Sequence, residues 1–305
     1  CGIAVVIGLN GRGIERAAVE RMAESLVHRG PDDSGIYVDG PVGMGFRRLS
    51  ILDLSEAGHQ PMVTSDQQYV LVFNGEIFNY VELRSELREL GYQFRSSGDS
   101  EVLLAAYREW GRNCLAKLNG MWAFVIFDRR RRCLFGSRDR FGVKPLYVSR
   151  VGDVVQFASE IKALRASGYV KAGINWTTAA RFLTEGRLDS QRETFYDGIE
   201  QIPPGSGFEV GLDGVWQQWS FWSLDRLPPS LVENPAERFA DLFEDSVRIR
   251  MRSDVPVGVC LSGGLDSTAI ICAAARQQGE RTTEPTESLQ AFCYMAKEFD
   301  ESRYI

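Results

Sequence analysis

The chain has 305 residues, enough for two domains, because a single hydrophobic core usually stops growing at about 250 to 300 residues. Hydrophobic residues make up 44% and charged residues 25% of it, a balance that excludes a disordered protein and is typical of a folded globular one. The formal net charge is -6 and the basic residues are scattered, which argues against a nucleic-acid-binding surface.

Short β-branched and aromatic runs recur along the first half of the chain and predict strands. They are IAVVIG (3–8), IYV (36–38), YVLVF (69–73), WAFVIF (122–127) and VVQF (154–157). Apolar residues at near-helical spacing predict helices over 14–27, 80–90 and 100–110. The basic run RRRR at 129–132 stands between apolar segments and indicates a solvated hairpin turn. Since helices interrupt the strands without regular alternation, we expect a layered α+β domain.

The character of the sequence changes after residue 222. The proline-rich stretch LPPS at 227–230 predicts a linker. We therefore expect a first domain over 1–222, a linker over 223–234 and an incomplete second domain over 235–305.

The second domain begins with the pattern of a nucleotide-binding α/β unit. The predicted order is a helix (235–251), a strand (255–261), a Ser-Gly-Gly turn, a helix (267–277) and a strand (289–295). In SGGLDS (262–267), main-chain amides at the start of a helix would form an anion site, and two glycines would let phosphate approach closely. No GxxxxGK[ST] motif is present, which argues against a Walker-type enzyme. A plain strand-to-helix connection is the alternative.

The sequence begins with Cys1, which at a chain terminus carries a thiol and an α-amine on one residue. An α-amine, with a reference pKa of about 7.7 to 8.0, can act as the general base for the thiol. A histidine base is then unnecessary, which suits a chain whose only histidines are His28 and His59. The alternative is that Cys1 is an ordinary small buried residue.

A thiolate that attacks a carboxamide creates an oxyanion, and each preorganised N–H donor stabilises it by about 3 to 4 kcal/mol. Asn74 and Gly75, directly after the strand at 69–73, offer a side-chain amide and an unhindered backbone N–H. Asn-Gly is as typical of a hairpin turn, so both interpretations stay open. An amino-acid substrate also needs an arginine and an acid, for which Arg48 and Asp99 are candidates, although such residues usually belong to the surface.

Spaced motifs along almost the whole chain share their order with one known family. They are Cys1-Gly2-Ile3, HRGPD (28–32), RLSILD (48–53), NGEIFN (74–79), SGDSE (97–101), GMWAF (120–124), RDRFGVKPLY (138–147), ASEIKAL (158–164), PPG (203–205) and SGGLDS (262–267). Together they resemble the glutamine-hydrolysing asparagine synthetase family, in which a class II glutamine amidotransferase domain precedes a synthetase domain.

The resemblance implies a four-layer αββα N-terminal-nucleophile (Ntn) hydrolase domain, followed by the beginning of an α/β ATP pyrophosphatase domain of the adenine nucleotide alpha hydrolase type. By position, it implies that Cys1 is the nucleophile and that Asn74 and Gly75 form the oxyanion hole. The implied glutamine-binding residues are Arg48, Ile51, Leu52, Asn74, Gly75, Glu76 and Asp99. The resemblance gives RDRFGVKPLY no chemical role.

In the family, the SGGLDS loop holds the pyrophosphate of ATP while a carboxylate is adenylated. The resemblance implies that the ATP-binding residues are Cys260, Ser262, Gly263, Gly264, Leu265, Asp266, Ser267 and Tyr294. It also implies that Asp266 helps to hold Mg²⁺.

The implied enzyme is a glutamine-dependent carbon-nitrogen ligase. Cys1 would hydrolyse glutamine to glutamate and ammonia, and the ammonia would attack aspartyl-AMP to give asparagine and AMP. One alternative is a related amidotransferase that acts on another carboxylate in natural-product biosynthesis. A second alternative is a non-catalytic scaffold, against which the joint presence of Cys1, Arg48, Asn74, Gly75 and Asp99 argues.

The expected partners are small molecules, namely glutamine, ATP and aspartate, and a homodimer is compatible with the resemblance. We expect neither nucleic acid nor a membrane, since no apolar run approaches the roughly 18 residues that cross a bilayer and no leader opens the chain. The six cysteines form no CxxC pair, which makes a zinc site improbable and fits reduced thiols in the cytoplasm.

Overall fold

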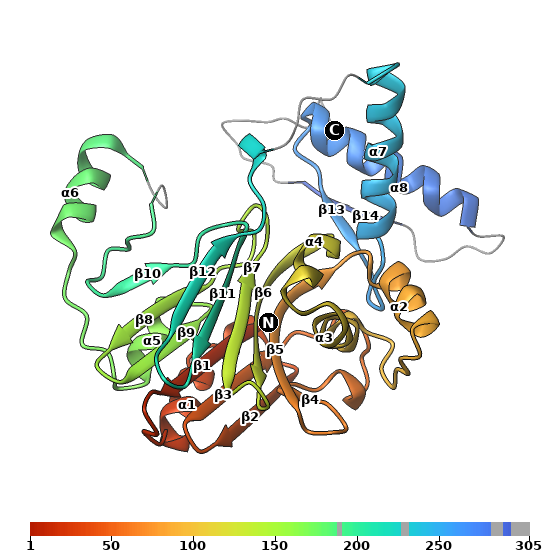
Figure 1. Cartoon of the computed structure of the whole chain (residues 1–305). Coiled ribbons are helices and arrows are strands. Elements are labelled where there is room, and N and C mark those ends of the chain that lie inside the picture. The colour runs from red at the N-terminus through yellow and green to blue at the C-terminus, as the bar shows by residue number, and fades with distance from the viewer. Residues whose placement is uncertain (188–190, 227–231, 282–288, 294–305) are drawn as a thin grey trace. The chain divides into compact units, whose positions relative to one another are not determined.

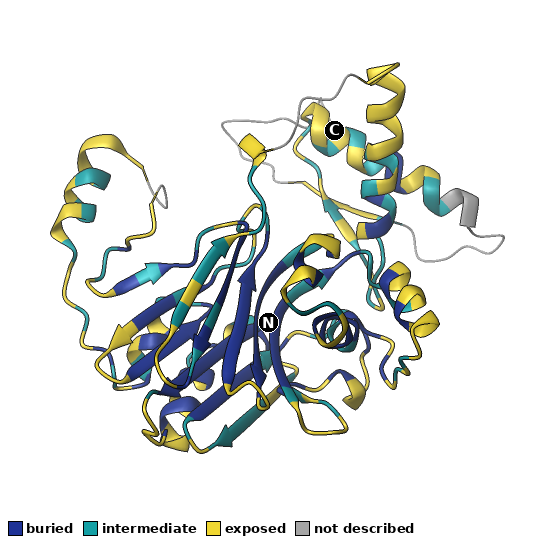
Figure 2. Cartoon of the chain, viewed as in Figure 1, coloured by how far each residue is buried: buried dark blue, intermediate teal, exposed yellow. Residues whose placement is uncertain are grey.

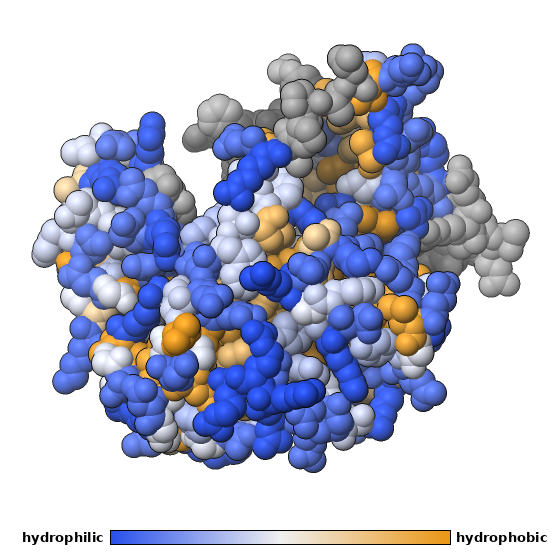
Figure 3. Space-filling view, in the orientation of Figure 1, coloured by the Kyte–Doolittle hydropathy of each residue, from blue (hydrophilic) through white to orange (hydrophobic). Residues whose placement is uncertain are grey.

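The computed structural model describes residues 1–187, 191–226, 232–281 and 289–293. The chain separates into two compact units, Cys1–Leu227 and Pro228–Ile305, which are considered one at a time (Figure 1). No helix in the described ranges is long and apolar enough to cross a membrane. The face of the protein seen in Figure 3 is mainly hydrophilic, with small separate apolar patches.

Two six-stranded antiparallel sheets form the first unit. In one sheet the order is β10 (Ile199–Gln201), β8 (Tyr147–Val151), β9 (Val154–Ala158), β1 (Gly2–Gly8), β3 (Val42–Arg48) and β2 (Asp33–Asp39). In the other it is β12 (Trp216–Ser220), β11 (Ser206–Gly211), β7 (Cys133–Arg138), β6 (Gly120–Asp128), β5 (Tyr69–Ile77) and β4 (Met62–Val63). Strand β1 pairs with β3 and β9, so the first residues of the chain lie inside a sheet and not at its edge.

The alternation of side chains along β1 shows how the layers are made. Ile3, Val5 and Ile7 belong to the core between the two sheets. Ala4 and Val6 point the other way, into a core shared with helices. Because successive strand residues face opposite sides, a strand buried on both faces reads as an unbroken apolar run.

Helices cover the outer face of each sheet. Helices α1 (Arg16–Glu24) and α5 (Ile161–Ala166) pack on the sheet that contains β1. Helices α2 (Tyr80–Glu89), α3 (Asp99–Trp110) and α4 (Cys114–Lys117) pack on the sheet that contains β5. Figure 2 shows the buried strands between partly exposed helices. The four-layer αββα arrangement predicted from the sequence is therefore confirmed.

The remaining helices of this unit are short or exposed. Helix α6 (Trp176–Glu185) has no buried residue. The 3-10 helices are η1 (Val27–Arg29), η2 (Glu56–Gly58), η3 (Gly111–Asn113) and η4 (Leu224–Arg226).

The predicted strands and helices of the first unit are present, with one correction. Asn74, Gly75 and Glu76 do not follow the strand but belong to β5, where Asn74 is opposite Ala123 and Gly75 is opposite Trp122 in β6. The hairpin interpretation of Asn-Gly is therefore wrong, because continued pairing with β6 keeps the chain extended. The basic run at 129–132 forms the expected turn, between β6 and β7.

The second unit has the predicted order of elements. It contains α7 (Pro235–Arg250), β13 (Gly258–Cys260), α8 (Leu265–Arg281) and β14 (Gln290–Phe292), and β13 and β14 are parallel. Val247 of α7 packs with Ala273 and Ala274 of α8 in a small core. Tyr294 lies outside the described residues.

Candidate active site

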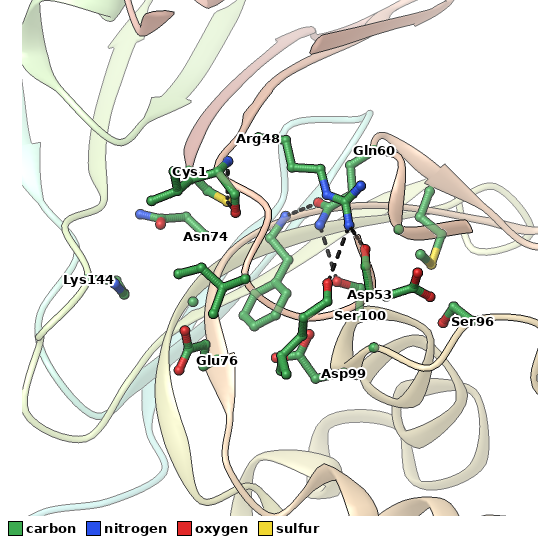
Figure 4. Close-up of a pocket in the computed structure, with 18 residues that line it drawn as sticks. Cys1, Arg48, Asp53, Gln60, Asn74, Glu76, Ser96, Asp99, Ser100 and Lys144 are labelled. Carbon is green, nitrogen blue, oxygen red and sulfur yellow. Dashed lines mark hydrogen bonds between the residues drawn. The ribbon is translucent and has the colours of Figure 1, made fainter. Parts of the chain in front are cut away.

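One cavity of the first unit collects the residues predicted for glutamine chemistry. It is lined by Cys1, Arg48, Leu49, Ile51, Leu52, Asp53, Gly58, Gln60, Met62, Phe73, Asn74, Gly75, Glu76, Ser96, Gly98, Asp99, Ser100 and Lys144 (Figure 4). The predicted nucleophile, oxyanion-hole residues and glutamine-binding residues all belong to this set.

The fold explains why distant segments meet here. Cys1 immediately precedes β1, and Arg48 ends the neighbouring strand β3 of the same sheet. Asn74 comes from β5 of the other sheet, and Asp99 is the first residue of α3. The cavity thus lies where the ends of two packed sheets and one helix meet.

Cys1 is held through its α-amine and its thiol. The α-amine donates a hydrogen bond to Arg29 O at 2.8 Å, and Leu49 N–H donates to Sγ at 3.4 Å. Burial, followed by the positive charges of Arg29 and Lys144, lowers the pKa of the Cys1 α-ammonium to about 5. The amine is therefore mostly neutral near pH 7 and able to accept a proton.

Asn74 provides an N–H group with nothing to bind. Its side chain is 2% exposed, and in the described part of the chain Nδ2 has no hydrogen-bond partner. Burying an unpaired N–H costs about 1 to 3 kcal/mol, so native proteins rarely leave one without a reason. In Figure 4 the Asn74 side chain lies beside Cys1, where an oxyanion formed by thiol attack would need a donor.

Gly75 has no room for a side chain. A Cβ atom there would lie 2.2 Å from Met121 O in β6, so a larger residue would push the two strands apart.

Arg48 needs a glycine at position 58, because a Cβ on Gly58 would lie 2.0 Å from Arg48 Nη2. Main-chain carbonyls hold the guanidinium, with Nη1 donating to Ser55 O at 3.0 Å and Nη2 to Leu52 O at 3.3 Å.

Two acids share another part of the cavity. The pKa of Asp99 is raised to about 7, mainly by burial and in smaller part by the negative charge of Glu76. The Ile77 N–H, which donates to Asp99 Oδ2 at 2.8 Å, acts in the opposite direction and lowers the pKa. Burial also raises the pKa of Glu76, while Lys144 opposes the shift. A bound ammonium group would favour the ionised form of both acids.

Comparison with known proteins fits this geometry. Residues 1–222 match the glutamine amidotransferase domain family, and residues 238–305 match the asparagine synthase family. The chain belongs to the glutamine amidotransferase domain family. The resemblance inferred from the sequence motifs is thus confirmed.

The curated relatives of this amidotransferase domain include asparagine synthetases. Asparagine synthetase [glutamine-hydrolyzing] 1 of Bacillus subtilis (strain 168) is 40% identical over 262 residues, which cover 84% of this chain and 40% of the relative. Asparagine synthetase [glutamine-hydrolyzing] 3 of the same organism is 36% identical over 279 residues, covering 90% and 45%. The chain therefore spans less than half the length of these two relatives.

A solved structure shares the fold of the amidotransferase domain. Glutamine phosphoribosylpyrophosphate amidotransferase from B. subtilis, complexed with ADP and GMP, superposes with a TM-score of 0.56 over 98% of this chain and 68% of its own. The two sequences are 17% identical, so this likeness concerns the fold alone. It agrees with the Ntn fold class expected from the sequence.

Several residues of the amidotransferase cavity were not predicted. Asp53 accepts the Ser97 N–H at 2.8 Å and so connects the Arg48 loop to the segment before α3. Gln60 accepts the Phe73 N–H at 2.7 Å and donates to Ser100 Oγ at 3.2 Å. Asp53 lay within a recognised motif, whereas Gln60 carried no signal in the sequence.

Lys144 is a further unpredicted residue of the cavity, and its position gives part of RDRFGVKPLY a structural role. The buried Asp139 accepts the Lys144 N–H at 3.0 Å, and Arg138 Nε donates to Lys144 O at 2.8 Å. This turn holds Lys144 in the wall of the cavity, near Glu76 in Figure 4. Burial lowers the pKa of Lys144, while Glu76 opposes the change.

The predicted ATP-binding residues that the structure describes, Cys260 and Ser262 to Ser267, lie together in the second unit. Cys260 ends β13, and the loop that follows leads into α8 at Leu265. The Ser262 N–H donates to Ser267 Oγ at 3.3 Å, and the Gly264 N–H donates to Ser262 Oγ at 3.4 Å. Gly263 has φ of 75°, a left-handed conformation that favours glycine.

Proposed function

We propose that Cys1 hydrolyses glutamine and that the complete protein uses the ammonia in an ATP-dependent amide synthesis, most simply that of asparagine from aspartate. The observation that carries the proposal is the unpaired, buried N–H of Asn74 beside a terminal thiol and its neutral amine. A non-catalytic scaffold would have no reason to keep this costly arrangement.

In the proposed reaction, Sγ of Cys1 forms a bond to the carboxamide carbon of glutamine, and the thiol proton moves to the α-amine. The carbonyl oxygen becomes an oxyanion that receives hydrogen bonds from Asn74 Nδ2 and the Gly75 N–H. When the carbon-nitrogen bond breaks, the proton on the α-amine goes to the leaving nitrogen, giving ammonia and a thioester. Water then hydrolyses the thioester to glutamate, and Cys1 regains its thiol proton.

The cavity would orient glutamine by its charged groups. The Arg48 guanidinium suits the α-carboxylate. The acids Glu76 and Asp99 suit the α-ammonium, and Ile51 and Leu52 of the Arg48 loop complete the wall.

The second unit would bind ATP and activate the acceptor. We assign residues 1–222 to the glutaminase domain, 223–234 to a linker and 235–305 to the start of the synthetase domain. The loop of Ser262, Gly263, Gly264 and Ser267, at the start of a helix, suits the phosphates of ATP. Attack of a carboxylate on the α-phosphate would release pyrophosphate, and ammonia would then displace AMP. The ATP contacts of Cys260, Leu265 and Tyr294 rest on the resemblance alone.

Asp266 is the residue that would hold Mg²⁺ with ATP. It is one exposed carboxylate in the first turn of α8, and Mg²⁺ is usually held by one or two carboxylates together with phosphate oxygens. The residues present therefore fit the ion, which would neutralise phosphate charge.

The substitution Cys1→Ala tests the proposal. We expect it to abolish glutamine-dependent synthesis by the complete protein while free ammonia still supports synthesis. Loss of both activities would count against two coupled sites. Mass spectrometry of the purified protein should also find Cys1 with a free α-amine, because any preceding residue would remove the base.

A panel of acceptor acids tests the choice of aspartate. We expect aspartate to stimulate conversion of ATP to AMP, and its failure alongside a positive result for another carboxylate would identify a different amidotransferase. Absence of a Cys1 adduct with an electrophilic glutamine analogue would instead revive the scaffold alternative.

The proposal also places the protein in the cytoplasm, which suits its six free cysteines, and includes its assembly as a homodimer.

A further inference from the structure

The motif ASEIKAL (158–164) has no role in the proposed reaction, yet its residues lie beside the start of the chain. Ser159 follows β9 and is fully buried. Its N–H donates to Ile3 O at 3.0 Å, and its Oγ accepts the Ile3 N–H at 3.0 Å. This double contact extends the β1–β9 pairing by one step and carries Glu160 toward Cys1.

Arg29 is the residue between Glu160 and the nucleophile. The Cys1 amine donates to Arg29 O at 2.8 Å, and Arg29 Nε donates to Cys1 O at 2.9 Å. The backbone and the side chain of one residue thus hold both polar ends of Cys1.

Glu160 in turn fixes the Arg29 side chain. Arg29 Nη1 donates to Glu160 Oε1 at 2.9 Å, and each of the two side chains is 25% exposed. His28 Nε2 lies 2.8 Å from the same oxygen, and Lys162 Nζ lies 3.2 Å from Oε2. Burial alone would raise the pKa of Glu160, but the hydrogen bonds from Arg29, His28 and Lys162 outweigh it and lower the pKa to about 2. The carboxylate is therefore charged throughout the neutral range.

We propose that Glu160 is a positioning residue of the glutamine-hydrolysing site, which acts through Arg29 to hold Cys1 in the orientation for attack. This inference rests on the proposed function. Glu160 is not among the residues that line the glutamine cavity. Its removal should therefore disturb the nucleophile and leave glutamine binding unchanged.

Kinetics of Glu160 variants give the first test. In the complete protein, Glu160→Ala should lower kcat for glutamine hydrolysis by about 10- to 100-fold with KM unchanged, because small displacements of a reacting group are that costly. Glu160→Asp, which keeps the charge, should recover part of the rate. The control is Glu20→Ala, which removes an exposed ion pair with Arg16 on α1. Wild-type kcat in Glu160→Ala, or a rise in KM that matches the loss in rate, would overturn the inference.

Labelling of Cys1 separates positioning from loss of structure. An electrophilic glutamine analogue needs an aligned thiol, so its rate should fall in Glu160→Ala by the same factor as kcat. Iodoacetamide needs no alignment and should label Cys1 in Glu160→Ala at close to the wild-type rate. Peptide-resolved mass spectrometry distinguishes labelling of Cys1 from labelling of the exposed Cys260, Cys272 and Cys293. An equal fall with both reagents would overturn the positioning role.

If Glu160→Ala does not fold, Glu160→Gln tests the positioning role, since it keeps the shape of the side chain and removes the charge. It should react more slowly with the glutamine analogue and at close to the wild-type rate with iodoacetamide. If the wild-type protein takes up iodoacetamide at Cys1 but neither reacts with the analogue nor hydrolyses glutamine, the proposed function itself fails.

Discussion

At the scale of single residues, burial makes two groups of the glutamine site titrate far from their usual range. Water stabilises charged forms, so burial lowers the pKa of an ammonium and raises that of a carboxyl. The amine of Cys1 falls to a pKa of about 5, and the carboxyl of Asp99 rises to about 7. In the proposed reaction the first shift prepares a base, and the second would make glutamine binding depend on pH.

These two shifts predict the pH profile of glutamine hydrolysis. The reaction needs Asp99 ionised and the Cys1 amine neutral, so both forms are present at high pH and are lost as pH falls. We expect log kcat/KM to decline with slope one below a pKa of about 7, and with slope two below about 5. Steady-state kinetics from pH 4 to 9 measure it, and a profile flat down to pH 6 would contradict the role of Asp99.

Asn74 gives a second prediction at this scale. Asn74→Ala should lower kcat for glutamine hydrolysis by about 100- to 1,000-fold, because one oxyanion donor is lost. The melting temperature should hardly change, since Nδ2 makes no hydrogen bond among the described residues. Asn113→Ala is the control, because Asn113 is exposed, has an ordinary helical φ of -71° and makes no capping hydrogen bond through its side chain. A rate near that of the wild type would remove Asn74 from the oxyanion hole.

At the scale of elements, glycines set the distances between the layers that hold the site. In β3, a Cβ on Gly43 would lie 2.5 Å from Val19 Cγ2 of α1, so glycine is what allows the helix to approach the strand. In β5, Gly75 likewise permits close pairing with β6. Residues carried on such packed strands are held more accurately than residues on loops.

Gly136 of β7 tests this view away from the site. A Cβ there would lie 2.2 Å from Phe208 Cζ, whose ring stacks against Phe157 at 4.6 Å and Trp216 at 5.5 Å. Gly136→Ala should destabilise the protein by about 1 to 3 kcal/mol through overpacking. Gly13→Ala is the control, since nothing lies within 4 Å of its added Cβ. Urea unfolding compares the two, and equal midpoints would contradict the packing argument.

At the scale of the whole molecule, the two units have separate cores. The three large apolar clusters of the described chain lie entirely within Cys1–Leu227, and the small cluster around Val247 lies within the other unit. A fragment of residues 1–227 should therefore unfold cooperatively on heating and still form a Cys1 adduct with an electrophilic glutamine analogue. Circular dichroism and mass spectrometry measure these properties. A fragment without a cooperative transition would show that the first unit depends on the rest of the chain.

The amino-acid sequence by itself determined the elements with long apolar runs, and it predicted residues that the fold brings together in one cavity. Signals made of adjacent residues can be recognised without the fold. Examples are the unbroken apolar run of β1 and the motifs RLSILD and SGGLDS. Strand β3 escaped prediction because its glycines weaken the strand signal, although those glycines serve the packing of α1.

Only the tertiary structure decided that Asn74 and Gly75 stay extended, that Gln60 and Lys144 enter the cavity, and that Glu160 reaches Arg29. Each of these outcomes depends on partners far away in the sequence, and their positions are set by sheet pairing and burial. The pKa shifts of Cys1 and Asp99 have the same origin, because exclusion of water is a property of the packed layers and not of any local motif.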